Sequence, residues 1–213
     1  QYQLCVEDGA CSEPSRKTLD GEPYYGEEAY ADHPVVWVTR AQAEAYCSYR
    51  NKRLPSEAQW EAAARGAEGR LFPWGEQTVG CGQVYYRNGT KECERLTRPT
   101  TSIDPDAIKV GNMQLRHMAA NVAEWVSTSF DELAYCDRSH TCSGADPSCV
   151  AECGGKALCK PAASWDPRPA SGAPGMVRGG SYLRTVCALR LFTRQAQNEA
   201  AEDVGFRCAA AAK

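Results

Sequence analysis

The stretch RGGSYLRTVCALRLFTRQAQNEAAEDVGFRC (Arg178–Cys208) carries more information about the fold than any other part of this chain. It opens with two consecutive glycines, closes with GFRC and holds one internal cysteine, Cys187. Three short motifs precede it in the sequence: KRLPSEAQWEAAARG (Lys52–Gly66), FPWG (Phe72–Gly75) and NVAEW (Asn121–Trp125). Because several specific motifs in a fixed order are far more diagnostic than one motif alone, they indicate a defined family of folds.

In this order the four motifs resemble the formylglycine-generating enzyme (sulfatase-modifying factor) family, over about residues 1–127 and 176–209. The resemblance implies a compact variant of the C-type lectin-like fold, which is α+β, disulfide-rich and low in regular secondary structure. We expect a single domain over residues 1–213 with a Cys-rich insertion at about 128–175. That segment is dense in Cys, Asp, Ser, Gly and Pro, so it needs disulfides to become ordered.

The tract after the two glycines departs from the family pattern. Family members bind copper(I) there between two cysteine thiolates and use it to activate oxygen. Counting forward from Ser181 puts the first cysteine position at or beside Arg184. Counting back from Gln197 and Asn198 puts the second on Cys187, with a shorter loop between them. A guanidinium is always charged and cannot replace a thiolate as a copper ligand, so we expect no copper site.

Composition favours a secreted or otherwise extracytoplasmic protein. Among 213 residues there are 12 cysteines, an even number that suggests oxidised pairs in the periplasm, at the cell surface or in a secretory pathway. The net charge is −3 with both signs mixed, which does not favour nucleic-acid binding or a polybasic membrane surface. The apolar runs are too short to span a bilayer, and we interpret the chain as a mature or trimmed form.

The cysteines can be paired in part. The family resemblance implies a bond between Cys47 and Cys208. Short separations favour local loops closed by Cys5–Cys11 and Cys81–Cys93. Five of the other six cysteines lie in the insertion, so we expect Cys187 to pair with one of them. These six, whose connectivity stays open, are Cys136, Cys142, Cys149, Cys153, Cys159 and Cys187.

Local patterns predict two capped helices and a few short strands. The capping box Thr39–Gln42 starts a helix that ends near Arg50, and the capping box Ser56–Gln59 starts one that runs to about Arg65. Apolar runs predict strands at His33–Val38, Val122–Ser127, Val177–Leu183 and Val204–Ala209.

The resemblance also implies a calcium site in the segment Ala119–Glu124. Its ligands would be the amide oxygen of Asn121, the backbone carbonyl of Val122 and the carboxylate of Glu124, all hard oxygen donors suited to calcium. The alternative is that Glu124 accepts hydrogen bonds from neighbouring amides and orders the loop. A second family calcium site is expected to be lost, because Tyr85 stands where an Asn is needed, unless Asp104 or Asp106 compensates in a rearranged loop.

Arginines and tryptophans gather in the family motifs. We expect the arginines of the C-terminal tract to pair with carboxylates inside the fold, and the motif tryptophans to lie in the core. Arg184, near the former copper position, and Trp165, in the insertion, are instead candidates for a ligand-binding surface. The motif residues are Arg178, Arg190, Arg194, Arg207, Trp37, Trp60, Trp74 and Trp125.

Three classes of function remain open. The first is a non-catalytic extracytoplasmic binding module, a pseudoenzyme whose partner is a protein, peptide or glycan. The second is a copper-dependent oxidase that converts a peptidyl cysteine to formylglycine in sulfatase maturation, with Cys187 as a ligand in an altered metal site. The third is a variable protein of a diversity-generating retroelement, because some of these share the frame from RGGS to GFR. We favour the first.

Overall fold

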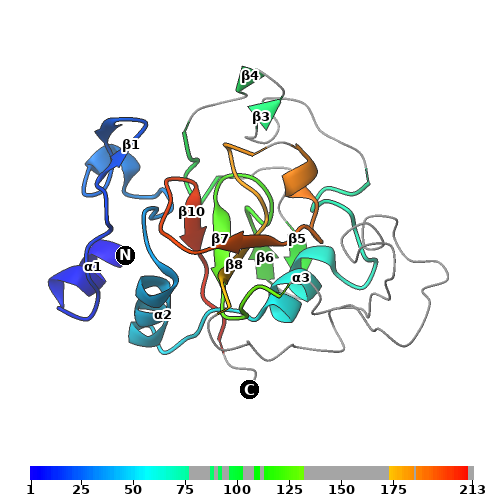
Figure 1. The fold of residues 1–213 in the computed structure, drawn as a ribbon, viewed down its shortest axis with the longest axis horizontal. Helices are drawn as coiled ribbons and strands as arrows, with labels where there is room; N and C mark the ends of the chain where they lie inside the picture. Colours follow the sequence, from blue (N-terminus) through cyan, green and yellow to red (C-terminus); the bar gives the residue numbers. More distant parts are fainter. Residues whose placement is uncertain are drawn as a thin grey trace.

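Short elements joined by long irregular connections make up the structure, a computed structural model that describes residues 1–76, 87–88, 91–92, 96–102, 108–110, 113–131, 173–184 and 186–210 (Figure 1). The helices are α1 (Tyr2–Glu7), η1 (Glu28–Tyr30), α2 (Arg40–Tyr49), α3 (Glu57–Arg65) and η3 (Val186–Leu189). The strands are β1 (Thr18–Leu19), β2 (Glu22–Pro23), β3 (Arg87–Asn88), β4 (Lys91–Glu92), β5 (Ile108–Val110), β6 (Met113–Leu115), β7 (Ala123–Val126), β8 (Gly175–Arg178), β9 (Gln195–Gln197) and β10 (Val204–Phe206). The predicted α+β class with little regular structure is confirmed.

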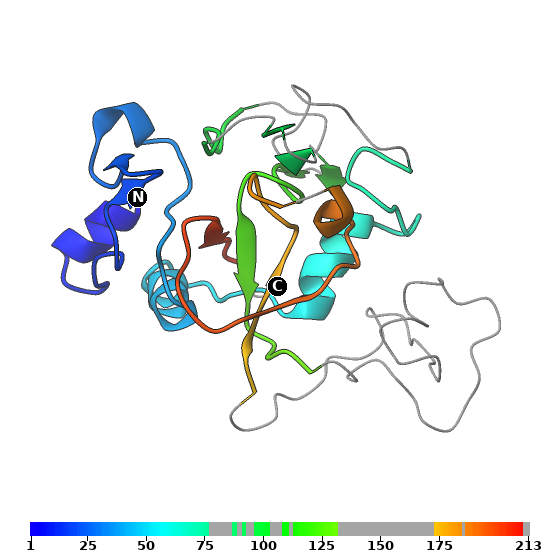
Figure 2. The ribbon, with the colours of Figure 1, turned by 45° about the horizontal axis from the view of Figure 1, so that its top comes forward.

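A four-stranded sheet in the order β10-β7-β8-β9 organises the molecule. Strand β7 pairs in parallel with β10 and antiparallel with β8, so Glu124 lies between Gly205 and Arg178. This register places the NVAEW motif at the centre of the sheet, flanked by the two ends of the C-terminal tract. Helices α1 and α2 lie on one side of the sheet and α3 on the other, as both views show (Figures 1 and 2).

Both predicted helices are confirmed with their capping boxes. The Thr39 side chain accepts a hydrogen bond from Gln42 N, and the Gln42 side chain accepts one from Thr39 N. Ser56 and Gln59 repeat this exchange at the start of α3. Each box satisfies backbone N–H groups that the first helical turn leaves without partners.

Two of the four predicted strands are wrong in whole or in part. Residues 33–38 form no strand, because Trp37 adopts a left-handed conformation with φ of +58°, although Val36 and Val38 are buried as expected. The strand predicted at Val177–Leu183 ends at Arg178, since Gly179 and Gly180 that follow both have positive φ. The strands predicted at 122–127 and 204–209 are present as β7 and the shorter β10.

The tryptophans of α3 and β7 form the centre of two core clusters. Trp60 and Trp125 are each 1% exposed, which confirms the prediction that they lie in the core. Trp37 and Trp74 are half-buried, and the guanidinium of Arg16 lies 4.6 Å from the centre of the Trp37 ring. The core thus forms around the packing of α2 and α3 against the sheet.

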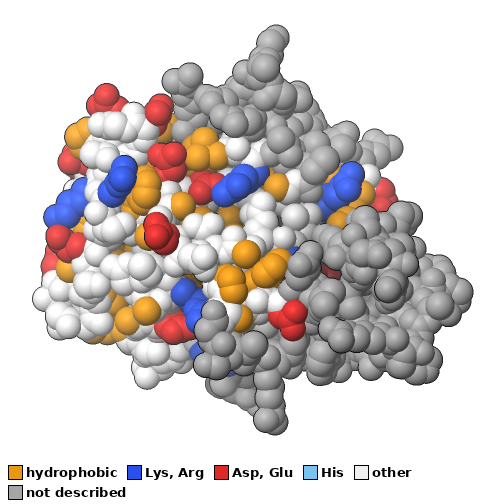
Figure 3. Space-filling view, viewed as in Figure 1, with side chains coloured by type: hydrophobic (Ala, Val, Ile, Leu, Met, Phe, Trp, Pro, Cys, Tyr) orange, Lys and Arg blue, Asp and Glu red, His pale blue; other side chains and the backbone are white. Residues whose placement is uncertain are grey.

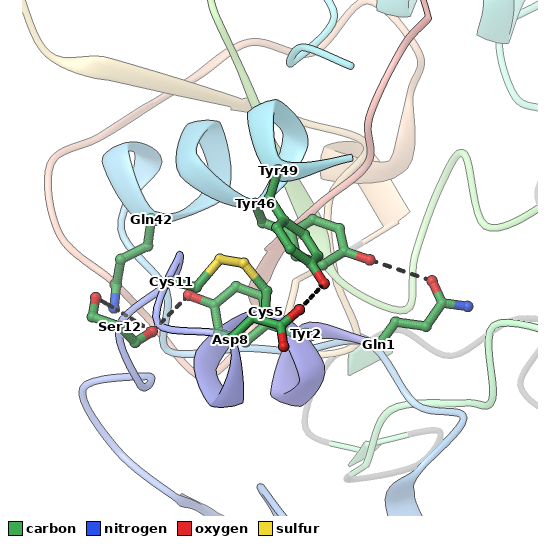
Figure 4. Close-up of a disulfide and its surroundings, with 9 residues drawn as sticks. All are labelled: Gln1, Tyr2, Cys5, Asp8, Cys11, Ser12, Gln42, Tyr46 and Tyr49. Atoms are coloured by element: carbon green, nitrogen blue, oxygen red, sulfur yellow. Dashed lines mark hydrogen bonds between the residues drawn. A yellow bond between two sulfur atoms is a disulfide. The ribbon is translucent and has the colours of Figure 1, made fainter. Parts of the chain in front are cut away.

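Two disulfides hold the N-terminal part of the described chain. Cys47 on α2 is joined to Cys208, directly after β10, which is the pairing that the family resemblance implies. Cys5 and Cys11 close a local loop at α1. Helix α1 packs on α2 through Tyr2, whose ring stacks on Tyr46 with centroids 5.5 Å apart (Figure 4). Helix α1 was not predicted, and tertiary contacts of this kind stabilise a helix of only six residues.

Candidate functional site

The two glycines after β8 turn the chain into the segment where the family holds copper. A Cβ on Gly180 would lie 2.7 Å from the Ala188 carbonyl oxygen, and one on Gly179 would lie 3.0 Å from the Met118 carbonyl oxygen. Both positions therefore need a residue without a side chain, for space and for positive φ. After this turn, the chain passes close to Gly180 again at η3.

A polar cluster follows the turn. The Ser181 hydroxyl donates a hydrogen bond of 2.7 Å to an Asp203 carboxylate oxygen, and both residues are buried. The same oxygen accepts a 3.1 Å hydrogen bond from Nε of Arg184, whose side chain is 43% exposed. Next to them, burial raises the pKa of Tyr182, assisted by the charges of Glu202 and Asp203. We call Ser181, Arg184 and Asp203 the Arg184 cluster.

Cys187 occupies the position that the resemblance assigns to the second cysteine. Its backbone is part of η3, but its side chain is not among those that the structure describes. Its expected pairing with an insertion cysteine therefore stays a prediction, as does a role for Trp165, which also lies outside them. Arg184, at or beside the position that the resemblance assigns to the first cysteine, forms an ion pair with Asp203. An occupied guanidinium–carboxylate pair supplies no soft ligand for copper(I).

Three of the four arginines expected to pair with carboxylates inside the fold do so, namely Arg178, Arg194 and Arg207. The prediction is not confirmed for Arg190, whose Nε is buried without a hydrogen-bond partner among the described residues. Arg178 is fully buried and donates to Glu57 at 3.0 Å, to Glu61, and to the Leu191 carbonyl oxygen at 2.7 Å. Arg194 forms a second ion pair with Glu57. These contacts tie α3 to β8 and to the segment before β9. A charged group can be buried in this way when every charge has partners.

Glu124 is engaged by protein donors. Its carboxylate accepts a 2.7 Å hydrogen bond from the Trp60 indole and a two-pronged ion pair from Arg207. The Asn121 amide oxygen accepts from Arg98 N at 2.9 Å, and the Asn121 carbonyl oxygen accepts from Tyr182 N at 3.0 Å. Glu124 thus accepts hydrogen bonds, as in the alternative, but its donors are the Trp60 indole and the Arg207 guanidinium rather than amides.

These oxygens do not fit a calcium ion in the observed arrangement. The ion would have to displace the guanidinium of Arg207 from Glu124. Over the described part of the chain, no group of three or more His, Cys, Asp or Glu side chains is arranged to hold a metal. Calcium binding at Asn121, Val122 and Glu124, which the resemblance implies, would therefore require Arg207 to move.

Asp203 is the functional candidate that the sequence did not reveal. It lies far from Ser181 and Arg184 along the chain, and no motif marks it. The parallel pairing of β10 with β7 brings it to the turn after β8, where Asp203 also accepts a hydrogen bond through its carbonyl from Ala123 N. Only the tertiary arrangement could assign it.

Charges of both signs are interspersed on the face of the molecule drawn in Figure 3, outside the grey atoms. This mixture agrees with the small net charge of −3. Within the described ranges, no helix is long and apolar enough to cross a membrane.

The geometry and the motifs define a domain of the formylglycine-generating type. A profile of the sulfatase-modifying factor enzyme 1-like domain matches residues 1–212, and the chain therefore belongs to this family, which confirms the resemblance drawn from its four motifs.

Relatives of this chain include both active and inactive members. The formylglycine-generating enzyme of Bos taurus is 29% identical over 196 residues, which cover 84% of this chain and 44% of that protein. The inactive C-alpha-formylglycine-generating enzyme 2 of Bos taurus is 32% identical over 106 residues, or 46% of this chain and 34% of that protein. The chain thus spans less than half the length of either relative.

Among solved structures, Treponema denticola variable protein 1 superimposes with a TM-score of 0.58 at 20% identity, covering 96% of this chain and 78% of that one. At this identity the similarity shows the shared fold alone. The predicted family variant of the C-type lectin-like fold is thereby confirmed.

Proposed function

We propose that this chain is a non-catalytic binding module built on the formylglycine-generating scaffold. The observation that carries the proposal is the Arg184 cluster: an arginine stands where the family resemblance puts the first copper-binding cysteine, and it pairs with buried Asp203. Oxygen activation in this family needs two thiolates at one metal. A guanidinium held by a carboxylate offers neither a thiolate nor room for the ion.

The same cluster supplies a recognition surface. Nε of Arg184 is fixed by Asp203, while 43% of the side chain stays exposed. A guanidinium fixed on one edge can present its other N–H groups to an acceptor with little loss of rotamer freedom. The partner would be a protein, peptide or glycan that offers a carboxylate or carbonyl oxygen at this position.

An extracytoplasmic location belongs to the proposal. Two disulfides in the described part of the chain, one of them joining residues 161 apart, are typical of proteins that mature in an oxidising compartment. The pairing of Cys187 with a cysteine of the insertion, if formed, would remove the remaining family thiol from metal chemistry.

Turnover of a peptide tests the proposal. The purified chain, loaded with copper(I), is incubated with a CxPxR-type peptide in air, and the peptide is analysed by mass spectrometry for conversion of cysteine to formylglycine. An active formylglycine-generating enzyme serves as the positive control. We expect no conversion by this chain. Conversion that continues over many turnovers would establish the oxidase with an altered metal site instead.

A further inference from the structure

A pocket of about 500 Å³ lies between the N-terminal residues, the segment around η1 and α2. This volume is in the range of sites that enclose a small molecule or a single large side chain. Six aromatic side chains line it: Tyr2, Tyr24, Tyr25, Tyr30, Tyr46 and Phe206. Figure 4 shows Tyr2 and Tyr46 close together, with Gln1 accepting a hydrogen bond from the Tyr46 hydroxyl. We call this the tyrosine pocket.

Contacts between the rings hold the walls of the tyrosine pocket in place. Tyr24 packs on Tyr30 with centroids 4.7 Å apart, and Tyr30 meets the His33 ring edge-on at 5.2 Å. The Tyr24 hydroxyl lies 2.6 Å from the Pro34 carbonyl oxygen and 2.9 Å from Thr97 Oγ1. Fixed rings of this kind form a binding surface that loses little conformational entropy when a ligand arrives.

The charged side chains that line the pocket all have one sign. Its lining includes the exposed acidic residues Glu27, Glu28 and Asp32 and contains no Lys or Arg among the described residues. None of these three carboxylates forms an ion pair within the part of the chain that the structure describes. Burial lowers the pKa of His33, so its ring adds no positive charge at neutral pH.

We propose that the tyrosine pocket binds an organic cation, an alkylammonium or guanidinium group. The faces of aromatic rings attract cations, and unpaired carboxylates at the rim add a favourable Coulomb energy. An anion would face three carboxylates, and a neutral apolar group would gain from the rings alone. The pocket shares no lining residue with the Arg184 cluster, so this inference goes beyond the proposed function and does not depend on it.

Binding is measured by NMR on the whole chain with labelled tyrosine rings. The first probe is n-butylammonium, and the second is a short peptide with one central lysine. The neutral control is the same peptide with its lysine acetylated at Nζ. We expect saturable shifts of ring signals with the cations and at least about tenfold weaker binding of the acetylated peptide. Stronger binding of the peptide than of butylammonium would assign the cation to a polypeptide, and the reverse order to a free amine.

Two variants separate charge from shape. Glu27→Gln with Glu28→Gln is expected to weaken cation binding about three- to tenfold and to remove most of its dependence on salt. Tyr30→Leu keeps an apolar wall and is expected to weaken binding about fivefold. The matched control is Glu22→Gln, an exposed residue of β2 outside the lining, which should leave binding unchanged.

The folded state of each variant is checked by its melting curve, because Tyr30 also packs against Tyr24. Equal binding of the lysine and acetyl-lysine peptides would overturn the proposal. So would the absence of saturable binding, or an equal loss in Glu22→Gln.

Discussion

The two ends of the tract Arg178–Cys208 are bonded to the core, whereas one side chain between them, that of Arg184, is partly open to solvent. At one end Arg178 is fully buried between Glu57 and Glu61, and at the other Cys208 is bonded to Cys47. Between them, the side chain of Arg184 is 43% exposed and pairs with buried Asp203. The same residue type thus serves the fold at one position and faces a potential partner at another.

This difference distinguishes the residues that stabilise the fold from the residue proposed to contact a partner. The ends fix the sheet, because β8 and β10 both pair with β7. With the ends fixed, an exposed position such as Arg184 can change without loss of the fold, which agrees with the proposal that an arginine stands in place of a copper ligand. Changes at the ends should therefore lower stability, and changes at Arg184 should alter binding.

The largest effect is expected at the Cys208 end. Cys47–Cys208 joins residues 161 apart, and a chain-entropy estimate for a loop of that length is about 5 kcal/mol. Replacing both cysteines by alanine should lower the free energy of unfolding by up to this amount in non-reducing denaturant titrations. The control is Cys5→Ala with Cys11→Ala, whose loop spans 6 residues and predicts only about 2 kcal/mol. Equal losses of unfolding free energy in the two variants would show that the length of the closed loop does not determine how much each disulfide stabilises the protein.

At the other end, Arg178→Met should lower the free energy of unfolding by about 3–5 kcal/mol. The change leaves Glu57 and Glu61 with one fewer cation in a buried setting, and unpaired buried charge is costly. Urea titration followed by circular dichroism measures the effect. The matched control is Arg184→Met. If its free energy of unfolding fell as much as that of Arg178→Met, the proposed difference between the buried arginine and the partly exposed one would be wrong.

Glu124→Gln is expected to cost about 1–3 kcal/mol, because Arg207 loses its counter-charge next to the Trp60 hydrogen bond. The same variant tests calcium. Since the ion must displace Arg207, we expect millimolar calcium to leave the melting temperature of the unmodified protein unchanged. A rise in melting temperature that Glu124→Gln abolishes would instead establish the calcium site.

The smallest effect on stability is expected for Arg184→Ala. Half-exposed ion pairs contribute little, so the free energy of unfolding should fall by less than about 1 kcal/mol. Thermal unfolding by calorimetry measures it. A much larger loss would mean that Arg184 is part of the scaffold, and the recognition surface would have to lie elsewhere.

Sequence alone identified the parts of the molecule that depend on local rules. The capping boxes at Thr39 and Ser56 gave the starts of both longer helices, because their hydrogen bonds join residues three apart. Family motifs implied Cys47–Cys208. The strand expected at 33–38 failed because apolar density reports burial, whereas the left-handed Trp37 is set by long-range contacts such as Trp37 N to the Ala201 carbonyl oxygen.

Only part of the candidate site could be predicted from the sequence. Arg184 stood out against the family pattern, but its partner Asp203 is brought beside it by the pairing of β10 with β7. The tyrosine pocket likewise joins Tyr24 and Tyr30 to Tyr46 and Phe206, which no spacing along the chain connects. Such sets of residues become recognisable only when the tertiary structure is known.

Copper(I) titration tests the central claim, that the Arg184 cluster is a recognition surface and does not hold copper. The protein, purified without reductant, is titrated with copper(I) against a competing chelator while free thiols are counted on the same sample. We predict no tight stoichiometric copper binding, and no gain of it in a gently reduced sample, because Arg184 cannot act as a ligand. One tightly bound copper ion per chain, together with a free thiol at Cys187, would contradict the account.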